Sequence, residues 1–136
     1  MKNLSITFFA IMAFVFTACS SNAQQNKQAV ANNTTAIQVI QFHSAHRCVT
    51  CLKIEKLTRT TLTASYRAVP FRLVNVDDKN NAKMAEQFQA SGTGLFLYNP
   101  KTGKKKDLTD FAFMRAGDDK KFAIELKKHI EDFIRS

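Results

Sequence analysis

The stretch "AIQVIQFHSAHRCVTCLKIE", residues 36–55, decides the expected fold of this chain. Its first seven residues alternate in character and include β-branched side chains, which predicts a strand over residues 36–42. A short polar turn follows, and leucines spaced among charged and polar side chains then predict a helix over residues 51–66. Cys48 and Cys51 are therefore expected between the end of a strand and the first turn of the helix that follows it.

The remaining chain continues the alternation of strands and helices. The patterns predict strands at residues 70–76 and 95–99, a helix capped by Asp77 or Asp78 that runs to about residue 90, a fourth strand or extended segment at residues 108–113, and a closing helix at residues 118–134. The order β-α-β followed by α-β-β-α requires both parallel and antiparallel strand pairs. We therefore expect one α/β domain over residues 36–136, with a central mixed β-sheet flanked by helices in the minimal order of a thioredoxin-like fold.

The first residues predict export. Lys2 precedes the apolar run "LSITFFAIMAFVF", residues 4–16, which is too short to span a bilayer as a mature helix. We interpret residues 1–18 as a signal peptide.

The stretch "FTAC", residues 16–19, resembles the lipobox of bacterial lipoproteins. The resemblance implies acylation of Cys19, which becomes the mature N-terminus and anchors the chain to a membrane, facing the periplasm. An ordinary cleavage site around residues 21–23 is the alternative, and it would give a soluble periplasmic or secreted protein. Residues 19–35 are rich in Asn, Gln, Ser and Thr, which predicts a disordered tether.

The chain is basic, with 20 Lys and Arg against 11 Asp and Glu. This excess alone does not choose among nucleic acid, anionic lipid and an acidic partner. Nucleic acid is not expected for an exported chain without aromatic side chains interleaved in its basic tract. That tract consists of Lys101, Lys104, Lys105 and Lys106, and it is interpreted as a solvated turn, with contact to anionic lipid as the alternative.

Because Cys19 belongs to the signal, Cys48 and Cys51 are the only two of the three cysteines left for the domain. A spacing of three residues at a helix start places both sulfurs on one face of the first turn. Free amide groups and the helix dipole there favour a thiolate at Cys48, and Arg47 and His46 are expected to add to this effect. The pattern predicts a thiol–disulfide oxidoreductase in which Cys48 attacks a protein partner and Cys51 resolves the mixed disulfide, without a cofactor.

Two other interpretations of the cysteine pair stay open. One is a static structural disulfide. The other is a binding site for a soft metal ion or arsenic(III), with His43, His46, Cys48 and Cys51 as candidate ligands. Gly94 is expected to favour binding, because a glycine beside the sulfurs leaves room for an ion that a proline would crowd.

The segments "FHSAHRCVTCLKIE", "VNVDD" and "DLTDFAF" together resemble the thioredoxin-like ArsF family, whose members are described as subunits of a nitrophenyl-compound nitroreductase. The resemblance covers most of the chain from about residue 37 and implies a redox role for Cys48 and Cys51, with electron relay to a partner as one form of it. Two positions depart from ordinary thioredoxins: Phe42 lies near the place of their buried acid, and Thr93 with Gly94 replaces their cis-proline. The sequence predicts no oligomeric state.

Overall fold

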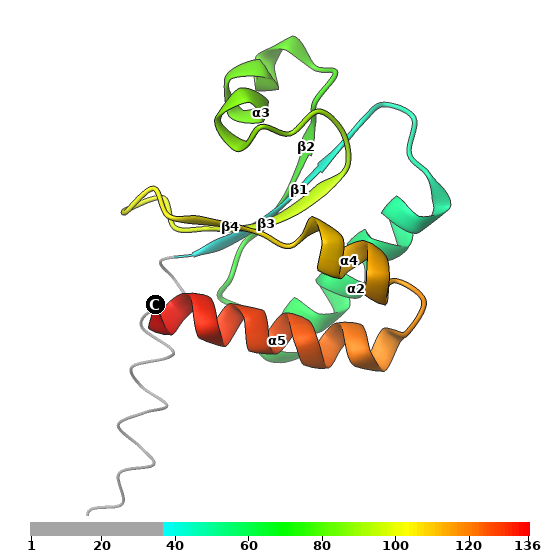
Figure 1. The fold of residues 1–136 in the computed structure, drawn as a ribbon, viewed down its shortest axis with the longest axis vertical. Coiled ribbons are helices and arrows are strands. Elements are labelled where there is room, and N and C mark those ends of the chain that lie inside the picture. The colour runs from blue at the N-terminus through cyan, green and yellow to red at the C-terminus, as the bar shows by residue number, and fades with distance from the viewer. Residues whose placement is uncertain (1–36) are drawn as a thin grey trace, which may run out of the picture.

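The computed structural model describes residues 37–136, which form an α/β arrangement consistent with a thioredoxin-like fold (Figure 1). The predicted fold class is therefore confirmed. The elements in chain order are β1 (Gln38–His43), α2 (Val49–Ser65), β2 (Phe71–Asn75), the 3-10 turn η1 (Lys79–Asn81), α3 (Ala82–Phe88), β3 (Gly94–Tyr98), β4 (Lys105–Asp107), α4 (Thr109–Arg115) and α5 (Asp119–Arg135). The predicted signal peptide, the tether and Cys19 lie outside the described residues.

The four strands form one mixed sheet in the order β2-β1-β3-β4. β1 is central: it pairs in parallel with β2 and antiparallel with β3, and β4 completes the sheet antiparallel to β3. The parallel pair requires a crossover, which α2 supplies. As a result, the chain leaves the central strand directly into the loop that carries the cysteines.

The sheet is covered on both faces (Figure 1). One core cluster joins Val39 of the central strand, and Ile37 just before it, to side chains of α2, α4 and α5. The other joins Ile40 and Phe42 to Phe88 of α3. Side chains two apart share a face of a strand, so Gln41, which follows Val39 in this alternation, points toward the face that α2 covers.

The fourth strand was predicted in the wrong place. Leu108 is the N-cap of the helix α4, which begins at Thr109, while β4 lies within the stretch predicted as a basic turn. The spacing of the buried side chains is that of one helix face: they are Leu108, Phe111 and Ala112. Burial of this face favours a helix over the short extended segment that the pattern predicted. β4 has the sequence KKD without a buried side chain, so no apolar alternation marks it as a strand.

Three of the helices begin close to the predicted places, and α5 starts one residue after its predicted start. α2 starts at Val49, two residues before the predicted start, which makes Cys48 its N-cap. The Asp78 side chain accepts the N–H of Asn80 and caps η1, which leads into α3.

None of the helices described in residues 37–136 has the length and apolar character needed to cross a membrane.

Candidate functional site: a disulfide at the start of α2

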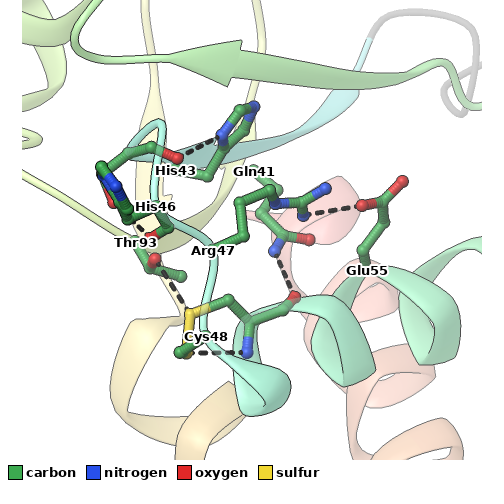
Figure 2. The surroundings of a disulfide bond; sticks show 9 residues. Gln41, His43, His46, Arg47, Cys48, Glu55 and Thr93 are labelled. Atoms are coloured by element: carbon green, nitrogen blue, oxygen red, sulfur yellow. Dashed lines mark hydrogen bonds and ion pairs between the residues drawn. A yellow bond between two sulfur atoms is a disulfide. The ribbon is translucent and has the colours of Figure 1, made fainter.

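Cys48 and Cys51 form a disulfide bond in the first turn of α2 (Figure 2). The two Cα atoms are 5.1 Å apart. Cys48 is exposed, whereas Cys51 keeps only 4% of its surface accessible to solvent. The pair is therefore asymmetric: one sulfur-bearing residue faces solvent and the other faces the core.

Two hydrogen-bond donors point at the sulfurs. The N–H of Cys51 donates to Cys48 Sγ at 3.1 Å, which is the interaction of a side chain that caps a helix. The hydroxyl of Thr93 donates to Cys51 Sγ at 3.3 Å (Figure 2). In the reduced protein, donors in these positions favour a negatively charged sulfur over a neutral thiol.

The loop between β1 and the disulfide is held by one contact from outside it and by one within it. Asp77, which follows β2, accepts the N–H of Ala45 at 2.7 Å through its carboxylate. The hydroxyl of Ser44 donates to the carbonyl of His46 at 2.9 Å. These contacts hold the approach to Cys48. No local sequence pattern marks the role of Asp77, because it lies 32 residues from Ala45.

Gln41 is a site residue that sequence reasoning missed. Its side chain is fully buried, and its Nε2 donates to the carbonyl of Cys51 at 3.0 Å. Its Oε1 is buried without a hydrogen-bond partner. The residue near the position of the thioredoxin acid, Phe42, instead points to the opposite core cluster. The sequence signal that could have revealed Gln41 is a polar residue at a position of the strand that is expected to be buried, because such a side chain needs a hydrogen-bond partner.

Arg47 was expected to stabilise a thiolate at Cys48, but its guanidinium binds a carboxylate instead. Its guanidinium forms an ion pair with Glu55 of α2 at 2.6 Å, as Figure 2 shows. Arg59 binds the same carboxylate at 2.8 Å. Burial opposes the ionisation of Glu55, but the hydrogen bonds from Arg59 and Arg47 outweigh it and lower the pKa of Glu55. The positive charge beside Cys48 is therefore compensated by a carboxylate.

The predicted metal ligands occupy different environments. His43 is half-buried with Nδ1 on the carbonyl of Ser44 at 2.9 Å, His46 is exposed, and both sulfurs are in the disulfide. Over residues 37–136, no three His, Cys, Asp or Glu side chains are grouped as a metal site. The structure thus brings Cys48 and Cys51 together without assembling the four-residue set.

The expected effect of Gly94 on ion binding stays a prediction. A Cβ at this position would meet Phe96 Cε2 at 2.8 Å and Thr109 Oγ1 at 3.1 Å, and neither atom belongs to the disulfide. The neighbouring Thr93 is the residue that contacts a sulfur. Gly94 is therefore a packing position where β3 passes the aromatic core and α4, and Thr93 forms the wall of the site.

An apolar surface adjoins the exposed cysteine. Val49 is 85% exposed and Leu52 is 48% exposed, both in the first turn of α2. Isolated exposed apolar residues are common, but these two lie within four residues of Cys48. A partner that reaches Cys48 would therefore contact apolar side chains.

No family model matches the chain, and no curated protein matches it in sequence.

Proposed function

We propose that this protein is a thiol–disulfide redox protein in which Cys48 exchanges disulfides with a protein partner. One observation carries the proposal: the disulfide joins an exposed N-cap cysteine to a buried cysteine in the same helical turn. An exposed sulfur that accepts an amide N–H at a helix start is the arrangement that favours a reactive thiolate. A static bridge needs no such exposure of one member.

In the reduced form, the Cys48 thiolate attacks one sulfur of the partner's disulfide. A mixed disulfide forms, and the partner's other sulfur leaves as a thiolate. Cys51 then loses its proton to water and attacks Cys48 Sγ, which restores the intramolecular disulfide and releases the second partner thiolate. Two electrons pass from the dithiol to the partner, and reduction of the Cys48–Cys51 bond follows the same steps in reverse.

The surroundings support this division of roles. Thr93 can donate to the sulfur of Cys51, which stabilises that sulfur as a thiolate when it must attack. Gln41 is bonded to the Cys51 carbonyl and holds this turn against β1. Neither residue carries a proton that titrates near neutral pH, so water is the proton acceptor in the proposed step.

The setting we propose is a periplasmic membrane surface, with Cys19 as the lipid-bearing N-terminus. It is supported by the apolar run and the "FTAC" stretch. Within that setting, an electron-relay role for a nitroreductase-type partner is the finer proposal, supported only by the resemblance of the "HRCVTC" and "DLTDFAF" segments to the ArsF family.

The test of the proposed lipid anchor is a substitution at Cys19. Replacing Cys19 by Ser should release the chain from membranes or block its processing. An unmodified N-terminus at Gln24 with unchanged membrane fractionation would contradict lipidation.

The decisive experiment combines a reduction potential with trapping. The Cys48–Cys51 couple is equilibrated with glutathione buffers, and Cys51→Ser and Cys48→Ser variants are incubated with an extract of the source cells. We expect Cys51→Ser to accumulate mixed disulfides through Cys48, and the matched Cys48→Ser variant to accumulate few. A potential far below the poise of the glutathione pool, with equally slow alkylation of both reduced thiols, would instead assign a structural bridge.

The same preparation tests the soft-metal alternative. The reduced protein is equilibrated separately with Zn(II) and with As(III), and bound ion is measured by elemental analysis after gel filtration. Stoichiometric binding that requires both cysteines and blocks exchange would favour the binding function. Ready exchange with no retained ion would leave the redox function alone.

A further inference from the structure

The loop between β3 and β4, together with β4, carries a group of lysines that the proposed redox function does not use. We call it the basic end, and it comprises Lys101, Lys104, Lys105 and Lys106. The first three are exposed and Lys106 is half-buried. Across residues 37–136, the ion pairs join other residues, and none includes a lysine of the basic end.

The polar partners of these lysines are neutral. Lys104 Nζ donates to the hydroxyl of Ser136 at 2.6 Å, Lys105 Nζ donates to the carbonyl of Gln87, and Lys106 Nζ lies 3.3 Å from the ring of His129. The nearest acid in sequence, Asp107, is already bonded to the N–H and the hydroxyl of Thr109. The basic end therefore presents positive charges without a carboxylate in contact with them.

The basic end lies where the chain enters the domain. Gln38, the first residue of β1, pairs with Tyr98, the last residue of β3. The lysine-bearing loop starts directly after Tyr98, and Figure 1 shows it at the same end of the sheet as the start of β1 and the end of α5. The 36 residues that precede Ile37 thus join the domain beside the basic end, and they include the apolar run of residues 4–16.

The disulfide lies at the opposite end of β1. The chain passes from Gln38 to His43 along this strand and reaches Cys48 only beyond it. Six strand residues span about 20 Å. A surface that contacts the basic end is therefore separated from the disulfide by roughly the length of the sheet.

We propose that the basic end docks on a membrane surface that carries anionic phospholipids, and that it holds the domain with the disulfide pointing away from the bilayer. Ammonium groups on long flexible side chains suit phosphate headgroups, and each lysine near such a surface contributes about a fivefold gain in partitioning. The entry of the chain at the same end makes this orientation compatible with an apolar or lipidated anchor. The proposal does not depend on the redox function.

The test uses the full chain with vesicles of phosphatidylcholine alone, or of phosphatidylcholine and phosphatidylglycerol in equal amounts. The apolar run can hold the chain on either lipid, so the readout is the difference between the two. One readout is acetylation of lysines on bound protein. We expect Lys101, Lys104 and Lys105 to be protected on the anionic vesicles only, while Lys56 and Lys79 stay reactive on both. The thiol of Cys48 in the reduced protein should keep its alkylation rate.

A matched pair of triple variants measures the charge effect. Lys101→Gln, Lys104→Gln and Lys105→Gln together remove the exposed lysines of the basic end. The control changes exposed lysines without ion pairs in the described part of the chain: Lys56→Gln, Lys79→Gln and Lys120→Gln. Both variants have the same net charge. We expect the first to lose on the order of a hundredfold of the preference for anionic vesicles, and the control to lose less than about threefold.

Several results would overturn the proposal. Equal losses in the two triple variants would assign lipid binding to overall charge rather than to the basic end. Protection of Lys56 and Lys79 in place of the basic end would reverse the orientation. Equal behaviour of the wild-type chain on the two vesicles, or lysine-dependent binding to RNA without any preference for anionic lipid, would remove the membrane surface as the partner. The footprint on wild-type protein gives its answer even if a variant does not fold.

Discussion

The side-chain amide of Gln41 donates a 3.0 Å hydrogen bond to the carbonyl of Cys51, and this bond joins the central strand to the buried half of the disulfide. The carbonyl lies in α2, where it also accepts the helical N–H four residues later. Gln41 Oε1, by contrast, has no hydrogen-bond partner although the side chain is fully buried. One buried amide thus makes a useful bond and carries an unsatisfied oxygen at once.

These opposing terms predict that Gln41→Met is tolerated. Methionine fills the same space, removes the unsatisfied oxygen and leaves the Cys51 carbonyl with its helical partner, so the free energy of unfolding should change by less than about 1 kcal/mol. Gln41→Ala should cost about 2–4 kcal/mol because it leaves a cavity. Urea unfolding of the oxidised proteins measures both values. A loss above about 3 kcal/mol for Gln41→Met would mean that Oε1 has a partner, such as a buried water.

Thr93→Val should slow the second step of disulfide exchange. Valine keeps the shape of threonine but removes the hydroxyl that donates to Cys51 Sγ, so the attacking thiolate of Cys51 is less stable. With a small aromatic disulfide as substrate, release of the first thiolate should keep its rate and release of the second should slow severalfold. Thr102→Val, in the exposed loop after β3, is the control. Equal rates for Thr93→Val and wild type would show that the hydroxyl does not act on Cys51.

Glu55→Gln should remove a pH-dependent part of the stability. The pKa of Glu55 is lowered in the folded protein, mainly through hydrogen bonds from Arg59 and Arg47 that outweigh burial. A lowered folded pKa contributes stability that is fully present above the unfolded value near 4.5 and is lost as the pH falls through the folded value. Wild type should exceed Glu55→Gln by about 1 kcal/mol at neutral pH and by nothing in strong acid.

The matched control for this titration is Glu86→Gln, whose carboxylate is exposed and has no ion pair in the described part of the chain. Unfolding free energies are measured from acid to neutral pH. The difference between wild type and Glu55→Gln should shrink to nothing in acid, whereas Glu86→Gln should stay close to wild type at every pH.

Glu55→Gln also frees the charge of Arg47, so the pKa of the Cys48 thiol in the reduced protein should fall. Alkylation of Cys48 by iodoacetamide near neutral pH should then become faster. A Cys48 thiol that titrates as in wild type would place Arg47 out of its electrostatic reach.

Gly94→Ala should destabilise the fold by about 1–3 kcal/mol, because the added methyl group meets the ring of Phe96 and the side chain of Thr109. Phe96 cannot move freely, since its ring packs edge-on against Phe42 and Phe88. Gly92→Ala is the control: its Cβ would meet no atom within 4 Å. Thermal unfolding compares the two. Similar midpoints for both variants would show that Phe96 yields without cost.

The sequence by itself determined the start of the domain and the chemistry of its candidate site. Alternation in residues 36–42 and the three-residue spacing of Cys48 and Cys51 are local signals, because a strand face repeats every second residue and a helical turn closes within four. These signals were enough to predict a strand followed by a cysteine pair at a helix start, and the order of all the elements added the mixed sheet. The lysine-rich edge strand β4 and the helix α4 were not predicted from the sequence, because β4 has no buried face and α4 is only two turns long.

Tertiary structure alone decided what surrounds the sulfurs. Thr93 lies 42 residues from Cys51 and reaches it only because β3 pairs beside β1. Asp77 reaches Ala45 because β2 lies along the other side of the same strand. Which polar groups meet a sulfur or a loop amide therefore depends on strand pairing and register, and those are chosen by burial over the whole domain rather than by any neighbouring residues.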